Sequence, residues 1–480
     1  MMPFDVQHYI NGKFVDGGER FSVYYPATGE VIGTAPDGGQ DEVNAAVEAA
    51  KQAFEKWSRT KPSERRRILN RFADAIRQHA DELARIETLD VGRPISENRH
   101  HYIERVAANI SFFADFATMV GSECYPMENG YVNYVLRQPV GVAALITPWN
   151  VPLMLETWKI GPALAFGNTV VLKPAEWTPL GAWKLAQLAQ EADLPPGVLN
   201  VVHGHGPNSA GEFLTTHPDV ALISFTGETT TGQTIMRNGA ATLKRYSFEL
   251  GGKGANIIFE DADLDRAVQI AKRAAYFNQG EFCLAGSRIF VHESIYDRFV
   301  ADFVEVAKGI RVGDPMDPET EMGALISPEH LERVLGFVRG SRDDGNEILT
   351  GGERLRLPGA LSGGNFMAPT VIAAKPQDRI CQDEVFGPVV TVTPFRTEEE
   401  VIAWANGTRY GLSAVVQTRD VSRAHRVAAA MKAGTVWVND FFVRDLRVPF
   451  GGMKHSGIGR EGGHYSMEFY TEAMNICVAV

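Results

Sequence analysis

Hydrophobic residues recur at helical spacing near the start of the chain. Between positions 41 and 57 they return every three or four residues and share one face: Val43, Ala46, Val47, Ala50, Phe54 and Trp57. This spacing predicts an amphipathic helix. Residues 63–80 and 81–91 show helical patterns too, so three helices are expected before residue 92.

The pattern changes after residue 140, where short runs of β-branched residues end in Gly or Pro and alternate with helical stretches. The runs predict strands at 142–147, 169–172, 199–202, 221–225 and 255–259. Helices are expected at 180–191 and 232–239. Alternation of strands and helices is typical of a parallel, doubly wound sheet, so the fold class is α/β.

A second α/β set follows. Helices are expected at 263–278, 294–310 and 397–406, and strands at 287–292, 370–372, 389–394 and 436–439. Two consecutive α/β units predict a cleft between them, which is where ligands usually bind.

Composition and charge narrow the functional classes. The 480 residues suggest roughly two to four structural units. The net charge is −12 and the acidic residues are spread along the chain, which disfavours nucleic acid and anionic membranes as partners. No apolar run is long enough to span a bilayer, and the N-terminus lacks a secretory pattern, so a cytoplasmic location is expected.

The cysteines do not form a metal-binding or disulfide pattern. They are far apart in the sequence and include no CxxC pair, so neither a metal site nor a disulfide framework is expected: Cys124, Cys283, Cys381 and Cys477. Only Cys283 lies in a glycine-punctuated loop between an expected helix and an expected strand. Such loops often carry catalytic groups, so Cys283 is the candidate nucleophile.

Three further segments carry candidate chemistry. In Phe225-Thr226-Gly227-Glu228 a strand leads through glycine into a helix, a geometry that suits a pyrophosphate, although a purely steric turn fits equally well and Glu228 disfavours a tight phosphate cradle. Lys173 and Glu176 follow a strand end, where they could hold a ribose or form a solvated loop. Glu249, before two glycines, is either a general base or a charge at a hinge.

Taken together, these segments resemble the aldehyde dehydrogenase superfamily over nearly the whole chain. The pieces that carry the resemblance occur in family order: Thr147-Pro148-Trp149-Asn150, Leu172-Lys173-Pro174-Ala175-Glu176, Phe225-Thr226-Gly227, Glu249-Leu250-Gly251-Gly252-Lys253, the Cys283 loop, Glu384-Val385-Phe386-Gly387-Pro388, and Pro449-Phe450-Gly451-Gly452-Met453-Lys454-His455-Ser456-Gly457.

The resemblance implies a fold with three parts. A Rossmann-like cofactor domain and an α/β catalytic domain are accompanied by a small β arm that joins subunits into a homo-oligomer, a dimer or a tetramer. The implied boundaries are 1–121, 140–249 and 448–465 for the cofactor domain, 250–447 for the catalytic domain, and 122–139 with 466–480 for the arm.

The resemblance also implies the roles of the catalytic residues. Cys283 attacks an aldehyde, the Asn150 side chain and the Cys283 N–H stabilise the oxyanion, and loss of hydride leaves a thioester. Glu249 activates the water that hydrolyses it, and Glu461 matches a second glutamate that helps to relay protons. The chemistry needs no metal.

NAD is the implied cofactor. Lys173 and Glu176 match contacts to the adenosine ribose, Glu384 matches the carboxylate on the nicotinamide ribose, and Phe386 packs near that ring. Glu176 would repel the 2′-phosphate of NADP, so NAD should be preferred. Further cofactor contacts are expected at Ile146, Thr147, Trp149, Phe225, Gly227, Glu228 and Leu250.

The segments 225–229, 444–452 and 459–463 resemble the muconic-semialdehyde branch, which acts in the ring-cleavage catabolism of aromatic compounds and includes 2-hydroxymuconate semialdehyde and 5-carboxymethyl-2-hydroxymuconate semialdehyde dehydrogenases. Such aldehydes carry distant carboxylates, which arginine pairs with well. The residues expected near the substrate are Arg105, Arg444, Arg447 and Phe450. The arginines could instead form structural salt bridges with Asp445 or Glu104.

Other functions remain open from the sequence. A broad-specificity or betaine-type aldehyde dehydrogenase is one, although an arginine-rich segment is unsuited to a cationic substrate. Relatives that transfer the acyl group to coenzyme A usually lack the Glu249 base. A non-catalytic protein of the same fold would not be expected to keep Asn150, Glu249 and Cys283 together.

Overall fold

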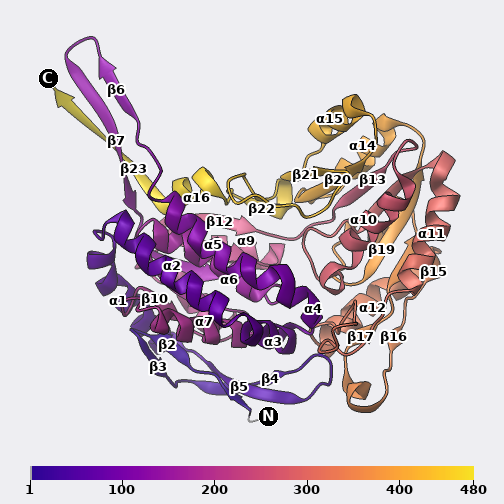
Figure 1. The fold of residues 1–480 in the computed structure, drawn as a ribbon, viewed down its shortest axis with the longest axis horizontal. Helices are drawn as coiled ribbons and strands as arrows, with labels where there is room; N and C mark the ends of the chain where they lie inside the picture. Colours follow the sequence, from indigo (N-terminus) through magenta and orange to yellow (C-terminus); the bar gives the residue numbers. More distant parts are fainter. Residues whose placement is uncertain (1–2) are drawn as a thin grey trace.

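The first α/β unit is built on an eight-stranded sheet in the computed structural model, which describes residues 3–480. The sheet order is β22-β12-β11-β8-β9-β10-β2-β3 (Figure 1). Its strands are β2 (His8–Ile10), β3 (Lys13–Val15), β8 (Val142–Ile146), β9 (Thr169–Lys173), β10 (Leu199–Val201), β11 (Val220–Thr226), β12 (Arg245–Glu249) and β22 (Gly457–Ile458).

The five central strands, β12 to β10, run parallel, which confirms the predicted α/β class. From β8 the chain adds β9 and β10 on one side, then returns to place β11 and β12 on the other. Ligands of open parallel sheets bind beyond the carboxyl ends of the strands at such a switch point. Here that point lies beyond Ile146 of β8 and Thr226 of β11.

Helices cover both faces of this sheet. Val142, Ala144 and Ile146 of β8 pack against one helical layer, whereas Ala143 and Leu145 pack against the other, as the alternation of side chains along a strand requires. The first layer contains α1 (Gln40–Trp57), α8 (Ala210–Thr216) and α9 (Thr229–Gly239), and the second contains α2 (Pro62–Gln78), α5 (Ile103–Phe116), α6 (Pro152–Ala165) and α7 (Leu180–Glu191).

The second unit is a seven-stranded sheet in the order β15-β18-β19-β14-β13-β20-β21, and only β15 is antiparallel to its neighbour. Its strands are β13 (Ala255–Ile258), β14 (Arg288–His292), β15 (Glu347–Thr350), β18 (Thr370–Ala373), β19 (Val389–Phe395), β20 (Ser413–Gln417) and β21 (Thr435–Val438). Its helices are α10 (Leu264–Tyr276), α11 (Tyr296–Lys308), α12 (Pro328–Asp343), α13 (Arg379–Gln382), α14 (Glu398–Asn406) and α15 (Val421–Ala430).

The remaining elements lie outside these two sheets. A three-stranded sheet contains β1 (Phe4–Asp5), β5 (Val31–Asp37) and β4 (Glu19–Tyr24), and a hairpin contains β16 (Arg354–Leu355) and β17 (Phe366–Met367). The short helices are α3 (Ala80–Val91), α4 (Ile95–Glu97) and α16 (Gly463–Tyr470). Across residues 3–480, no helix is both long and apolar enough to cross a membrane.

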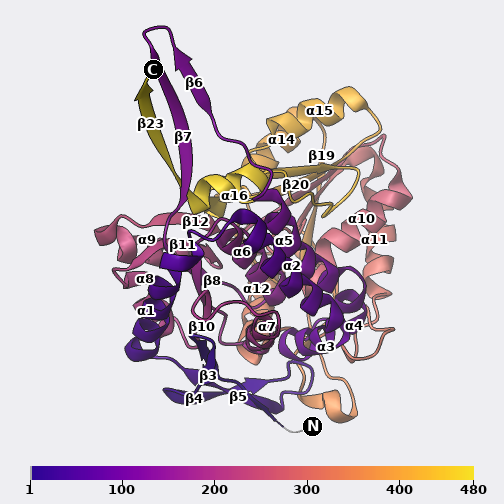
Figure 2. The same cartoon turned by 60° about the vertical axis from the view of Figure 1, so that its left-hand side comes forward.

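Three antiparallel strands form an arm that projects from the first unit (Figures 1 and 2). They are β6 (Cys124–Met127), β7 (Tyr131–Pro139) and β23 (Thr471–Ala479), with β7 in the centre. The arm carries several exposed apolar side chains, namely Tyr125, Met127, Tyr131, Leu136, Met474 and Val478. The boundaries expected for the arm and the two domains remain predictions.

The predicted helix 263–278 extends two residues beyond the C-terminal end of the observed one, α10 (Leu264–Tyr276). Helix α10 ends at Tyr276, because Asn278 and Gln279 adopt left-handed backbone angles with φ of 50° and 57°. The chain therefore turns sharply and enters the loop that carries Cys283.

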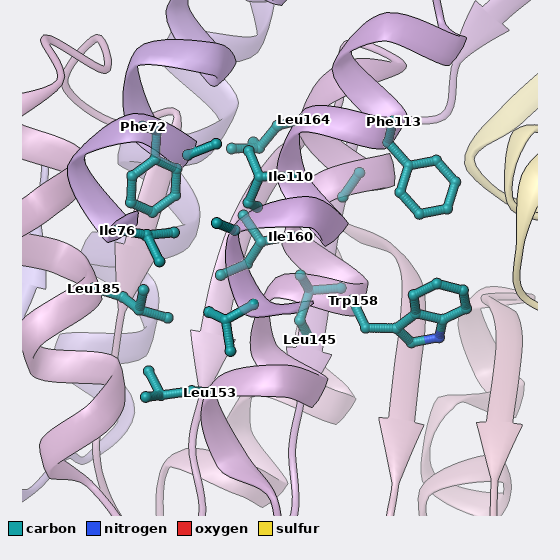
Figure 3. Packing of buried hydrophobic residues seen from close by; sticks show 14 of the residues in the cluster. Phe72, Ile76, Ile110, Phe113, Leu145, Leu153, Trp158, Ile160, Leu164 and Leu185 are labelled. Carbon is teal, nitrogen blue, oxygen red and sulfur yellow. The ribbon is translucent and has the colours of Figure 1, made fainter. Parts of the chain in front are cut away.

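The core between α2, α5, α6 and β8 supports the first unit (Figure 3). Ile160 at its centre is fully buried beside Ile110 and Leu145 (Figure 3). Ile160→Ala should lower the free energy of unfolding by about 2–5 kcal/mol, because a cavity is left, and Ile160→Val by only about 0.5–1.5 kcal/mol. Urea unfolding measures both, with the exposed Val421→Ala as control. Equal losses in Ile160→Ala and Val421→Ala would contradict the packing described.

Candidate active site

Cys283 lies in the loop between the turn Phe277–Gly280 and β14. The side-chain amide of Asn278 holds this loop by donating to the carbonyls of Glu281 and Asn150, both at 2.9 Å. Cys283 is half-buried, whereas Cys381 is fully buried and Cys124 and Cys477 are exposed on the arm. Of the four thiols, Cys283 is thus the one that lies, half-buried, in a loop held by side-chain hydrogen bonds.

Asn150 is buried next to the same loop. Its side-chain amide donates one hydrogen bond to the Glu281 carbonyl at 2.9 Å. Within residues 3–480 its second N–H has no acceptor, so it is available to an oxygen bound near Cys283. A fixed amide donor of this kind can stabilise an oxyanion.

Glu249 ends strand β12 with a buried carboxyl group. Neither of its side-chain oxygens has a hydrogen-bond partner among the described residues. Burial and, next, the nearby Glu461 raise its pKa well above the ordinary value, while Lys159 and Arg444 oppose them. Gly451, with φ of 151°, backs this carboxyl closely: a Cβ there would come within 2.8 Å of Oε1.

Glu461 is buried too, but its carboxylate is fully engaged. Oε1 accepts from Lys159 Nζ and Ser224 Oγ at 3.0 Å each and from Ser247 Oγ at 3.4 Å, and Oε2 accepts from the Trp158 indole. A paired and hydrogen-bonded carboxylate can stay charged in the interior, whereas the unpartnered Glu249 is disfavoured as an anion.

A cavity of about 740 Å³ lies between α5, α6 and the Phe442–Arg444 segment. Its walls are partly apolar, with Met154, Leu155, Trp158, Phe277 and Phe442 among the lining residues. Two arginines, Arg105 and Arg444, also line it.

Arg444 and Arg105 have no ion pair with the described residues. The Arg444 guanidinium lies 3.7 Å from the centre of the Phe450 ring and 5.0 Å from that of Trp158. Burial lowers the pKa of Arg444 to about 10, and Arg105 contributes in the same direction. Burial lowers the pKa of Arg105 as well. Two desolvated cations that face one cavity favour an anionic ligand.

The carboxyl groups of the same cavity do not neutralise these arginines. Glu104 is engaged by Arg77, whose guanidinium donates to both of its oxygens at 3.1–3.2 Å. Burial raises the pKa of Glu97 to about 7. Arg447 lies outside the cavity lining: it is 75% exposed and pairs with Asp445 at 2.6 Å. The structural salt bridge expected as an alternative for the arginines is therefore seen for Arg447 alone.

A second cavity, of about 850 Å³, separates α9 of the first unit from α12 of the second. Glu228 and Glu384 both line it. Glu384 Oε1 accepts from the Gly252 N–H at 2.7 Å, and burial raises the pKa of this carboxyl to about 7. Trp149 belongs to an aromatic group, with its ring centre 5.3 Å from that of Phe386 and 5.1 Å from that of His330.

The switch point of the first sheet offers unpartnered polar groups. The hydroxyls of Thr147 and Thr226 are buried there without hydrogen-bond partners among the described residues. Nearby, Lys173 and Glu176 pair at 3.3 Å. Burial opposes the charge on Glu176, but Lys173, a backbone hydrogen bond and His205 together outweigh burial, and the pKa of Glu176 falls below the ordinary value. This arrangement suits a ligand with hydroxyl and phosphate groups.

Other predicted cofactor residues pack around this region. Ile146, Phe225 and Leu250 belong to the buried cluster beneath the switch point. Gly227 is required by packing, because a Cβ there would come within 2.4 Å of the Phe225 ring. Sequence reasoning missed Trp158, Lys159 and Ser224, which hold Glu461, since no local signal separates them from other core positions of a helix or strand.

The fold and the site can be compared with known proteins. The sequence pattern of the aldehyde dehydrogenase family matches residues 14–476. The chain belongs to the aldehyde dehydrogenase family. It is 49% identical over 477 residues to the 2-aminomuconic semialdehyde dehydrogenase of Danio rerio, with 98% of each chain covered. It is 48% identical over 464 residues to the 5-carboxymethyl-2-hydroxymuconate semialdehyde dehydrogenase of Escherichia coli, with 96% of this chain and 98% of that one covered.

A solved structure of this family gives the same picture. The crystal structure of PnpE in complex with nicotinamide adenine dinucleotide superposes with a TM-score of 0.97 at 45% identity, covering 100% of this chain and 98% of that chain. The predicted family, the aldehyde dehydrogenase fold and the similarity to muconic-semialdehyde dehydrogenases are thereby confirmed. The roles of individual site residues remain predictions.

Proposed function

We propose that this aldehyde dehydrogenase oxidises a carboxylate-bearing semialdehyde of the muconic type to the corresponding acid. The observation that carries this proposal is the pair of arginines, Arg105 and Arg444, which line one cavity without ion partners among the described residues. Relatives named for 2-aminomuconic and 5-carboxymethyl-2-hydroxymuconate semialdehydes support it. Their substrates combine an aldehyde with a distant carboxylate, which this cavity would hold at its arginine-lined end.

NAD is the cofactor, as in the related PnpE complex. Lys173 and Glu176 would hold the adenosine ribose, and Glu384 would hold the nicotinamide ribose. The unpartnered hydroxyls of Thr147 and Thr226 lie where the sheet would receive the nucleotide. When bound, NAD accepts the hydride that the aldehyde carbon loses.

The side chains of the chain itself would divide the remaining chemistry. The Cys283 thiol gives up its proton to solvent, its sulfur forms a bond to the aldehyde carbon as the C=O π bond breaks, and the N–H groups of Asn150 and Cys283 stabilise the resulting oxyanion. Loss of hydride leaves a thioester on Cys283. Glu249 takes a proton from water as the water attacks the thioester carbon, and the thiolate leaves with the acid as product.

Glu461 would receive the proton that Glu249 gains, while Lys159 holds the Glu461 carboxylate by donating to it. Glu461 acts electrostatically on Glu249 and is bonded to Lys159 at 3.0 Å, so a charge change on one group alters the others. Because burial keeps the pKa of Glu249 high, its basic form should increase as the pH rises above neutrality.

The arm supports a homo-oligomer. Its exposed apolar side chains, among them Tyr125, Leu136 and Met474, lie on strands that project away from the rest of the subunit (Figure 2). Two- and three-stranded ribbons with apolar faces gain stability when another surface covers them. We infer that a second copy of the chain covers this arm, in a dimer or a tetramer.

The Cys283→Ala variant should lose dehydrogenase activity and still bind NAD, because only the nucleophile is removed. NADH formation measures activity, and quenching of intrinsic fluorescence measures binding. Cys381→Ala is the matched control, since this second thiol is buried in a separate core cluster. Normal turnover of Cys283→Ala, or its loss in Cys381→Ala alone, would overturn the assignment.

The Glu249→Gln variant should stall after hydride transfer. One equivalent of NADH per subunit should form in a burst, followed by a steady rate at least about a hundredfold lower, because the thioester lacks its water-activating base. Stopped-flow absorbance measures both phases. An unchanged steady rate would transfer the role of base to another group, with Glu461 the first to examine.

Removing the Arg105 charge should weaken binding of the carboxylate-bearing aldehyde. A desolvated, charge-assisted pair contributes about 1.5–3 kcal/mol, so Arg105→Gln should raise KM about ten- to a hundredfold for that substrate. A neutral aldehyde of similar size should be unaffected, and Arg105→Lys should restore only part of the loss.

Arg447→Gln is the matched control for this prediction. The arginine is exposed and paired with Asp445, so its removal should leave KM unchanged for both substrates. A uniform loss across charged and neutral aldehydes in Arg105→Gln would show that Arg105 is structural and would contradict the anchoring.

A further inference from the structure

The backbone of the Glu384–Phe386 segment is held by side chains of helix α12. The Arg333 guanidinium donates to the Val385 carbonyl at 2.8 Å and to the Glu384 carbonyl at 3.1 Å. His330, three residues earlier in α12, contacts the next carbonyl, that of Phe386, through Nε2 at 2.7 Å. Residues three apart on a helix lie on the same side, so one face of α12 is bonded to three successive carbonyl groups.

The Nε2 atom of His330 is the donor in this contact. A carbonyl oxygen can only accept a hydrogen bond, so the proton of the neutral imidazole lies on Nε2. Burial lowers the pKa of His330 to about 4, and the ring therefore carries only this one proton near neutral pH. The same atom lies 3.6 Å from Glu281 Oε1, beyond the length of a normal hydrogen bond. The donor is thus committed to the Phe386 carbonyl.

Phe386 needs such a restraint because its backbone lies in the left-handed region. Its φ is 61°, which a bulky side chain rarely allows. A conformation of this kind persists only where the surrounding contacts hold it. The next residue, Gly387, packs closely against the same helix, since a Cβ there would come within 2.8 Å of Val334. The hydrogen bond from His330 therefore helps to hold a backbone conformation that is unfavourable by itself.

The start of α12 also contacts the segments that carry the proposed reacting groups. Ile326, just before the helix, donates its N–H at 3.0 Å to Oε1 of Glu281, which lies two residues before the proposed nucleophile. The His330 ring packs edge-on against Trp149, the residue before the proposed oxyanion donor, with the ring centres 5.1 Å apart. His330 therefore lies where these two segments meet the one that would hold the nicotinamide ribose.

We propose that His330 is a positioning residue for hydride transfer: by donating to the Phe386 carbonyl, it holds the Glu384 and Phe386 side chains in place for the nicotinamide end of NAD. It would act through the backbone, since Arg333 and Glu384 line the cavity of about 850 Å³ and His330 does not. Hydride transfer requires close alignment of the two carbons, so a small displacement of this segment lowers the rate strongly. The role rests on the proposed cofactor contacts of Glu384 and Phe386.

The fluorescence of NADH bound to the full-length enzyme tests this role without turnover, because the nicotinamide ring is the fluorophore. His330→Leu and His330→Met fill the space but lack the donor. In both, the ring should move more freely and the fluorescence anisotropy of bound NADH should fall. His330→Gln keeps an N–H donor near the position of Nε2 and should restore most of the anisotropy. Binding of ADP, measured by calorimetry, should be unchanged, because ADP lacks the nicotinamide end.

Single turnovers with the enzyme in excess over the aldehyde measure the chemical consequence. At saturating NAD, the rate constant of NADH formation should fall about tenfold in His330→Leu and His330→Met, and it should recover in His330→Gln. In the two variants without the donor, deuterium on the aldehyde carbon should slow NADH formation, because hydride transfer then limits it.

Val338→Ala is the matched control. Val338 is buried further along the same helix, so its truncation should lower the Tm but leave the NADH anisotropy and the rate of NADH formation unchanged. The proposal is refuted if both His330→Leu and His330→Met behave like the unmodified enzyme in anisotropy and rate. Losses in His330→Gln as large as those in His330→Leu would refute it too, since the donor would then be irrelevant.

Glu384→Gln separates this role from the function on which it rests. If this variant binds NADH and forms NADH as the unmodified enzyme does, the proposed contact with the nicotinamide ribose is wrong and the role of His330 falls with it. If Glu384→Gln weakens NADH binding and slows NADH formation while the His330 variants without the donor remain normal, the proposed cofactor contact stands and only the positioning role fails.

Discussion

The site depends on one costly feature, the buried carboxyl group of Glu249 that has no hydrogen-bond partner among the described residues. An uncompensated buried carboxylate is strongly disfavoured, so the Glu249 carboxyl is largely protonated near neutral pH, and it acts as a base through the fraction that has lost its proton, which grows as the pH rises. The surroundings preserve that state. Gly451 closes over the carboxyl, while Glu461 takes the available donors of Lys159, Ser224 and Ser247 for itself. A structure that donated hydrogen bonds to Glu249 equally well would lower the pKa of its carboxyl and leave a weaker base.

The two α/β units each contribute half of this arrangement. Glu249 ends one strand of the first sheet and Asn150 follows another, whereas Cys283 precedes a strand of the second. The Asn278 side chain joins them, because it donates to the backbone of Asn150 and to that of Glu281. The left-handed turn at Asn278 and Gln279 is what brings that amide into position. The reacting groups are thus placed by contacts between units, and packing of the units against each other sets their distance.

Periodicity alone could predict much of the fold but less of the site. The helix expected at 180–191 coincides with α7, and the strand expected at 199–202 overlaps β10. In both, the apolar residues that made the pattern are buried in the structure. Strand β12 was not predicted, because Arg245 and Tyr246 give it a polar start that does not look like a buried strand. Its hydrogen bonds to β11 and β22 form it nevertheless. Spacing could not separate Arg444 from Arg447 either. Arg444 is buried against aromatic rings, whereas Arg447, three residues later, is exposed and paired with Asp445. Only tertiary packing decides this difference.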